Sequence, residues 1–245
     1  MPIFGFFRWG LILQAIALVH FARRRPDTFW LWIIIFFGPI GALVYMAMEM
    51  VPDLDLLRGS FNRFSRRRRI GVLEGVVTEN PAVGNLEELA DLLLEERQFA
   101  RARGLYDRII GGRIDSSDPY YRRGIAALEM GDAASAVADL ERVVASDPKY
   151  DFNRAIGLLA HAHALAGAPD KADACFTRAL AVSTLSATHY NSAAFLAALH
   201  RTAEAREWAA RLVARKSTIP RYLQRRERPW FRRAKALIKK LPAAS

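Results

Sequence analysis

Small apolar residues recur along the middle of the chain at a nearly constant interval. One series consists of alanines at intervals of 34, 36 and 33 residues: Ala102, Ala136, Ala172 and Ala205. A second series of small residues keeps the same steps twelve positions earlier: Ala90, Gly124, Ala160 and Ala193. Self-similarity near this period is typical of stacked helical repeats. The pattern therefore predicts helix pairs in which the small residues let neighbouring helices approach closely.

The repeats divide the middle of the chain into four copies, at about 83–116, 117–152, 153–185 and 186–217. Gly131 and Gly167 fall where the chain must reverse between two helices, a place where a positive φ is useful. Pro148 ends the second pair of helices, because the residue before a proline is disfavoured in a helix. We predict an all-α fold, with an N-terminal helical hairpin, a solenoid and a C-terminal capping helix.

Two of the copies carry a recognisable motif. The second copy has Tyr120, Gly124, Gly131, Ala136 and Pro148, and the third has Ile156, Ala160, Gly167, Ala172 and Phe176. Over about residues 83–217 the chain resembles the tetratricopeptide-repeat (TPR) family. The fourth copy lacks the turn glycine and the aromatic residue, as is common for terminal repeats. The resemblance implies a right-handed solenoid that binds a peptide segment of a protein partner on its concave face.

The same resemblance places the first helix of each pair on that concave face. Spacing within the motif then assigns eight residues to a partner-binding groove: Glu87, Asp91, Tyr121, Ile125, Leu128, Arg154, His161 and Tyr190. The Lys and Asn positions of the carboxylate clamp found in chaperone-binding members are not present. For each of the eight residues, a solvated helix face is the alternative interpretation.

Two apolar stretches, 3–21 and 29–48, dominate the N-terminus. About 20 helical residues span roughly 30 Å, the hydrocarbon thickness of a bilayer. We therefore predict a transmembrane hairpin over residues 1–51. A cleaved signal peptide and a re-entrant hairpin are the alternatives for this region. The connection contains three arginines, and six more follow the second stretch, which favours termini on the cytoplasmic side. The expected location is a bacterial inner (plasma) membrane, multi-pass, with the repeats in the cytoplasm.

The hairpin has a second resemblance, to the two-helix anchor of cardiolipin synthase and phospholipase D–type membrane proteins. The residues that carry it are Arg24, Arg25, Pro26, Trp32, Pro39, Gly41, Ala42 and Tyr45. It covers only residues 5–50. The catalytic signature of that family, a histidine two before a lysine with an aspartate further on, is absent from the sequence, so its chemistry is not carried over.

Basic residues gather in the connector, 52–82, and in the tail, 218–245. In the connector we expect contact with anionic lipid headgroups from Arg58, Arg63, Arg66, Arg67, Arg68 and Arg69. A solvated linker is the alternative. In the tail, apolar residues at helical spacing follow Pro229. They predict a helix that caps the solenoid, or one that lies on a membrane surface or an acidic partner.

Composition adds little chemistry to this architecture. The 245 residues carry a net charge of +11 and a single cysteine, Cys175, so an internal disulfide is excluded. His161 and His163 are two residues apart, so on a helix they face different ways and cannot chelate one metal ion. The sequence contains no glycine-rich phosphate loop and no metal or nucleophile motif. We therefore expect no enzyme, no metal, no cofactor and no nucleic-acid partner.

These observations lead to two functional hypotheses. The first is a membrane-anchored scaffold or adaptor that recruits a protein partner through the concave face of its repeats. The second is an accessory subunit of a membrane enzyme or transporter, bound through the hairpin. The sequence does not indicate the identity of the partner or the oligomeric state.

Overall fold

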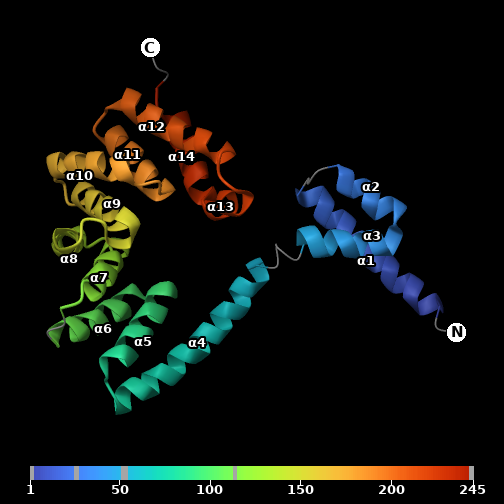
Figure 1. Ribbon diagram of the computed structural model, residues 1–245, viewed down its shortest axis with the longest axis horizontal. Coiled ribbons are helices and arrows are strands. Elements are labelled where there is room, and N and C mark those ends of the chain that lie inside the picture. The colour runs from blue at the N-terminus through green and yellow to red at the C-terminus, as the bar shows by residue number, and fades with distance from the viewer. Residues whose placement is uncertain (1–2, 25–27, 51–54, 113–114, 243–245) are drawn as a thin grey trace. The chain divides into compact units, whose positions relative to one another are not determined.

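The computed structural model describes residues 3–24, 28–50, 55–112 and 115–242, and these form helices joined by turns, without a strand (Figure 1). The chain divides into two compact units, Met1–Arg69 and Ile70–Ser245. The boundary falls within the long helix α4 (Asp55–Glu79). The predicted all-α fold with a helical-repeat solenoid is thus confirmed for the described part of the chain.

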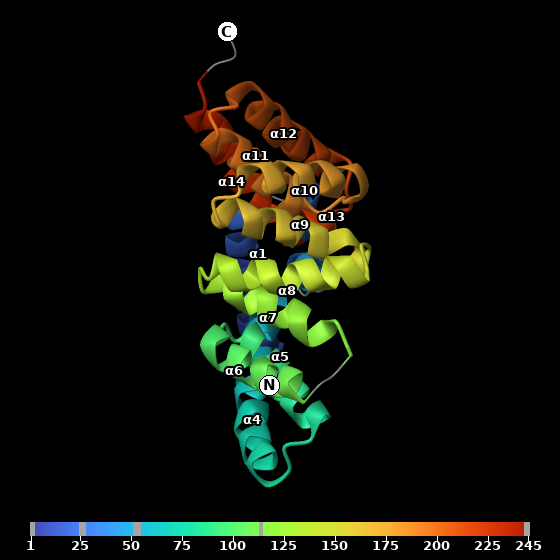
Figure 2. The same cartoon turned by 90° about the vertical axis from the view of Figure 1, so that its left-hand side faces the viewer.

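Four antiparallel helix pairs build most of the second unit, and they stack in sequence order (Figure 2). The pairs are α5 (Val83–Glu95) with α6 (Phe99–Gly111), α7 (Asp118–Glu129) with α8 (Ala133–Ser146), α9 (Tyr150–Leu165) with α10 (Pro169–Val182), and α11 (Ser186–Ala198) with α12 (Thr202–Ala214). Besides its own partner, each first helix contacts the first helix of the next pair: α5 packs on α7, α7 on α9 and α9 on α11. The first helices therefore share one face of the solenoid.

The repeated small residues lie where the helices touch. Ala102, Ala136, Ala172 and Ala205 are completely buried. In the second pair, a Cβ added to Gly124 would lie only 3.1 Å from Cγ of Leu140 on the facing helix. Interiors are packed at crystal density, so a larger side chain at these positions would push the helices apart. Close helix contact is the physical cause of the period seen in the sequence.

All four helix pairs turn in the same way. The turn residue has a positive φ: Arg97 (62°), Gly131 (79°), Gly167 (73°) and His200 (59°). The residue after it donates its N–H to a carbonyl five residues back, at 2.8–3.0 Å, and this is the Schellman motif. The four turns therefore share one geometry, although only two of them contain glycine.

Helices at both ends cover the outermost repeats. Ile70, Leu73 and Val77 of α4 are buried in one cluster with the apolar residues of α5 and α6. At the other end, α14 (Arg228–Lys240) packs on α11 and α12, and buries Phe231 and Ala234. The short helix α13 (Arg221–Arg226) precedes it. Each terminal repeat thereby has an apolar face removed from water.

Before α4, the first unit is a small helical hairpin whose second half is broken. It contains α1 (Ile3–Arg24), α2 (Phe29–Phe36), α3 (Gly38–Tyr45) and the π-helix η1 (Met46–Met50). The break lies at Phe37 and Gly38, where Gly38 has a φ of 54° and Pro39 follows. Gly10 of α1 lies against Pro39, because an added Cβ would come within 2.7 Å of its Cγ.

The break corrects the sequence prediction for this region. The hydropathy of the stretch 29–48 predicts a helix that spans the bilayer, but the stretch forms two separate helices, α2 and α3, of eight residues each, about 12 Å of rise apiece. Within the described residues, no helix is both long enough and apolar enough to cross a membrane. The predicted inner-membrane location is therefore wrong, and the resemblance to the cardiolipin synthase anchor is not supported.

The interior of this hairpin holds polar side chains. Gln14 donates a hydrogen bond to the carbonyl of Ile34 at 3.0 Å, and the His20 ring and the Tyr45 hydroxyl are 2.9 Å apart. Tyr45 is completely buried. The hairpin is therefore held by specific polar contacts as well as by apolar packing.

The connector arginines lie on one continuous helix, α4. Arg66 is half-buried and Arg67, Arg68 and Arg69 are exposed on α4. The side chains of Arg58 and Arg63 lie outside the described residues, as do Arg25 and Pro26 of the hairpin loop. Contact of these arginines with lipid is not supported.

The turn geometry predicts the effect of a glycine at position 200. His200 is exposed and occupies the left-handed position of its Schellman turn, which costs an L-residue about 1–2 kcal/mol more than glycine. Glycine also loses about 0.5–1 kcal/mol of chain entropy. We expect His200→Gly to be more stable than His200→Ala by about 0.5–1 kcal/mol, measured by urea unfolding. Equal stability of the two variants would contradict the assigned turn.

Candidate functional site

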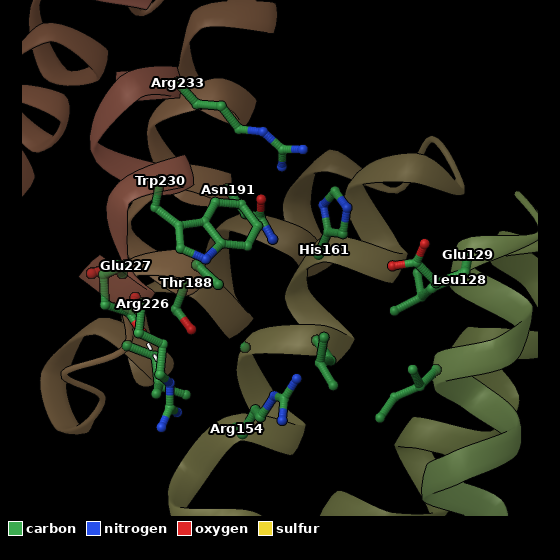
Figure 3. A pocket seen from close by; sticks show the side chains of 16 residues that line it. Leu128, Glu129, Arg154, His161, Thr188, Asn191, Arg226, Glu227, Trp230 and Arg233 are labelled. Atoms are coloured by element: carbon green, nitrogen blue, oxygen red, sulfur yellow. Dashed lines mark ion pairs between the residues drawn. The ribbon is translucent and has the colours of Figure 1, made fainter. Parts of the chain in front are cut away.

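The concave face of the solenoid contains two adjoining cavities. The larger, the C-terminal cavity, has a volume of about 580 Å³ and lies between α7, α9 and α11 on one side and α13 and α14 on the other (Figure 3). The smaller, the central cavity, has a volume of about 380 Å³ and is lined by α7 and α9. Both are lined by Ile125 and Arg154, so together they form one groove along the first helices.

Five of the eight sequence-predicted groove residues line this groove. Ile125, Leu128, Arg154 and His161 line the C-terminal cavity, and Tyr121 joins Ile125 and Arg154 at the central one. The spacing rule that selected the first helices therefore brings these side chains together.

The other three residues lie outside both cavities. Asp91 accepts a hydrogen bond from the hydroxyl of Tyr106 at 2.6 Å. Tyr190 stacks on Trp230 with ring centroids 5.7 Å apart, and it packs in the core of the fourth repeat. Glu87 is half-buried on α5, away from the lining residues.

The C-terminal tail forms a wall of the C-terminal cavity that the sequence did not indicate. Its lining residues are Arg226, Glu227, Trp230 and Arg233. In Figure 3, Trp230 and Arg233 project from α14 toward the open space above α9 and α11. The apolar spacing after Pro229 indicated a capping helix. It could not indicate that the other side of this helix would border the groove. Thr188 and Asn191 of α11 were also missed.

Two tyrosine–carboxylate pairs line the central cavity. The Tyr121 hydroxyl donates to Asp151 at 2.5 Å, and the Tyr150 hydroxyl donates to Asp118 at 2.8 Å. Burial, and then the hydrogen bond to Asp151, raises the pKa of Tyr121 well above its ordinary value, so the hydroxyl remains a donor. Arg154 approaches Asp151 at 3.6 Å. The charges of this cavity are therefore largely compensated from within the chain.

The backbone at the start of α9 is unusual. Asp151, Phe152 and Asn153 have φ values of 48°, 53° and 65°, although none is glycine. Left-handed geometry costs about 1–2 kcal/mol for each such residue. The turn brings Asp151 to Tyr121 and leaves Phe152 91% exposed. Strain of this kind is concentrated at functional sites in proteins, and here it lies at the edge of the groove.

The charge of the C-terminal cavity comes from arginines and glutamates. It is lined by Arg154, Arg226, Arg233, Glu129 and Glu227. Burial lowers the pKa of His161, and the neighbouring carboxylate of Glu129 opposes this shift only in part. The imidazole is therefore neutral at pH 7, and the lining has a small positive charge.

The lining of the C-terminal cavity offers groups for binding a ligand. The described residues contain no group of three or more His, Cys, Asp or Glu side chains that could hold a metal ion. Cys175 is half-buried on α10, and burial raises the pKa of its thiol, which lowers its reactivity at neutral pH. The cavity presents arginine, amide, hydroxyl and apolar groups, a set suited to holding a chain segment.

Comparison with known proteins supports a tetratricopeptide-repeat fold. Residues 117–150 match the sequence model of the tetratricopeptide repeat. YrrB, described as a TPR protein with an unusual peptide-binding site, has a TM-score of 0.53 and 15% identity, over 66% of this chain and 82% of YrrB. TTC0263, a TPR protein of Thermus thermophilus, has a TM-score of 0.55 and 18% identity, over 76% of this chain and 97% of its own.

A third structure agrees with these two. A tetratricopeptide repeat protein from Parabacteroides merdae has a TM-score of 0.50 and 9% identity, over 91% of both chains. A comparison with curated protein sequences gave no match. The chain thus contains a tetratricopeptide repeat, and its helical array has the TPR fold, as the sequence predicted.

The floor of the groove gives a prediction about packing. A Cβ added to Gly157 of α9 would lie 2.6 Å from Oγ1 of Thr188 on α11. We expect Gly157→Ala to lower the free energy of unfolding by about 1–3 kcal/mol through overpacking. Gly104→Ala is the matched control, because that helical glycine has nothing within 4 Å, and it should gain up to about 1 kcal/mol.

A second substitution tests the cause. Thr188→Ala, added to Gly157→Ala, removes the obstructing hydroxyl and should restore much of the lost stability. Both measurements require urea unfolding followed by circular dichroism. If Gly157→Ala were as well tolerated as Gly104→Ala, the close contact between α9 and α11 would be wrong.

The lowered pKa values of three histidines give a prediction of how the stability of the fold depends on pH. Burial lowers the pKa of His161, His163 and His189 in the folded chain, whereas an unfolded imidazole titrates at a pH of about 6.5. As the pH falls through that value, the unfolded chain binds protons first, so the free energy of unfolding decreases. We expect this decrease between about pH 7.5 and 5.5 in urea titrations, and a smaller one for His163→Gln. Rising stability over this range would contradict it.

Proposed function

We propose that this protein is a scaffold or adaptor that holds a segment of a protein partner in the groove formed by its TPR-fold array. The observation that carries the proposal is the continuity of the two cavities along α7, α9 and α11, with Ile125 and Arg154 common to both. A volume of about 580 Å³ lies within the range of ligand pockets.

The composition of the groove supports a peptide ligand. Apolar side chains of Ile125, Leu128 and Leu158 lie beside hydrogen-bonding groups from the neighbouring helix. An extended peptide needs both, because its backbone donors and acceptors lose water when its side chains enter apolar pockets. The peptide-binding site ascribed to YrrB is consistent with this use of the fold.

The alternative, an accessory subunit bound to a membrane enzyme or transporter through its hairpin, depended on a spanning helix. No such helix is present among the described residues. The concave groove is therefore the better-supported interaction site.

A charge reversal in the groove tests the proposal. Arg154 lines both cavities, and its side chain is 54% exposed, so Arg154→Glu should fold normally. The full-length variant is used as bait in a quantitative pulldown from the native cell. We expect the amount of specific partner that it captures to be at least about tenfold lower than for wild type. A loss of one charged contact inside an interface commonly has that size.

The matched control is Arg178→Glu, on the outer helix α10 of the same repeat. It introduces the same charge change outside the groove, so capture should be unchanged. Equal capture by wild type and by Arg154→Glu, or equal loss in both variants, would contradict the groove as the binding site.

A further inference from the structure

We propose that the C-terminal cavity recognises a carboxylate of an acidic peptide segment, with Arg233 of α14 as the binding group. This inference deepens the proposed function, and rests on it, by specifying the chemistry of the partner. It follows from the pairing of the charges in the cavity, from two polar groups without partners, and from the way in which Arg233 is held.

The first observation is that Arg233 has no carboxylate of its own. Glu227 lies 3.8 Å from Arg226, Glu129 lies 3.4 Å from Arg97, and Arg154 has Asp151 within 3.6 Å. Among the described residues, no acidic side chain pairs with Arg233, although it lines the cavity. Arg233 is therefore the arginine of this lining that remains available to a ligand.

The second observation is that Arg233 is held in place. Its guanidinium lies over the ring of Trp230, 4.8 Å from the centroid. Trp230 in turn stacks on Tyr190, which packs in the core of the fourth repeat. A guanidinium stacked on a fixed aromatic ring loses less conformational entropy when it binds than a free side chain does. The stack thus prepares Arg233 for a planar anion.

The third observation is a pair of neutral groups beside the arginine. Thr188 lines the cavity, and only 4% of this residue is exposed. Neither its hydroxyl nor the amide of Asn191 has a hydrogen-bond partner among the described residues. Buried polar groups in proteins are usually paired. A ligand that accepts and donates hydrogen bonds would satisfy both groups.

Geometry and charge favour a carboxylate in a peptide. In Figure 3, Arg233 and Arg154 lie at opposite ends of the cavity, with Trp230, Asn191 and His161 between them. A chain segment can therefore run from one arginine to the other. Glu129 and Glu227 border the same space and limit its positive charge, which disfavours dianionic phosphate and the polyanionic backbone of nucleic acid.

The test uses the full chain labelled with 5-fluorotryptophan and followed by ¹⁹F NMR. The sequence has five tryptophans, and Trp230→Phe identifies the resonance of position 230. The probes are two octapeptides, acetyl-(Ser-Glu)₄-amide and its neutral isostere acetyl-(Ser-Gln)₄-amide. We expect the Glu peptide to shift the Trp230 resonance and to bind about tenfold more tightly, as for a hydrogen bond to a charged group.

Two arginine variants separate a specific site from general attraction. Arg233→Gln should abolish the preference for the Glu peptide. Arg232→Gln is the matched control, since Arg232 is exposed on the same helix and lies outside the cavity lining, and it should preserve the preference. Asn191→Ala provides a second variant inside the cavity and should weaken binding several-fold.

Further peptides distinguish the source of the carboxylate. If acetyl-(Ser-Gln)₄ with a free C-terminus binds as tightly as the Glu peptide, the site takes a terminal carboxylate and the proposed acidic segment is wrong. If it binds as weakly as the neutral amide, the site takes acidic side chains, as proposed. Tighter binding of a phosphoserine-containing peptide than of the Glu peptide would overturn the proposal.

Three other results would also overturn it: equal affinity for the Glu and Gln peptides, equal losses for Arg232→Gln and Arg233→Gln, or a Trp230 resonance that does not respond. Such a failure is distinguishable from failure of the groove itself. If Arg154→Glu still loses the captured partner while the Glu peptide shows no preference, the groove binds a protein and the carboxylate site is wrong.

Discussion

Close contact between helices at small residues is the constraint on which the rest of the structure depends. Ala102, Ala136, Ala172 and Ala205 are completely buried, and no larger side chain would leave their helices at the same separation. Each pair of helices packs on the next through the same arrangement, so the first helices lie side by side. The concave face is therefore a consequence of packing between repeats.

The same constraint places the polar groups of the groove. Gly157 lets α9 approach α11 so closely that Thr188 meets its backbone, and this contact forms the floor of the C-terminal cavity. At the central cavity, Tyr121 of α7 and Asp151 of α9 form a short hydrogen bond. It opposes the cost of the left-handed turn at 151–153. Rigid packing thus supports an unusual backbone at the edge of the groove.

Comparison of the four turns separates geometry from residue identity. Gly131 and Gly167 adopt the positive φ that their sequence indicated, but Arg97 and His200 adopt it too. Their Schellman hydrogen bonds to Leu93 and Leu196 are as short as those of the glycine turns. The packing of the helix pairs stabilises the turn enough to overcome the preference of the individual residue. This explains why the first and fourth repeats fold normally despite their weaker motifs.

The sequence by itself determined the repeat, its period and the face that lines the groove, because these depend on local size and spacing along each helix. Five of eight groove residues followed from that rule. The tertiary structure decided what spacing cannot express. The break of the apolar stretch 29–48 at Gly38 and Pro39 is local in origin, but hydropathy alone does not register it. The tertiary structure directed Trp230 and Arg233 of α14 toward the groove, since the orientation of a packed helix depends on its neighbours, α11 and α12.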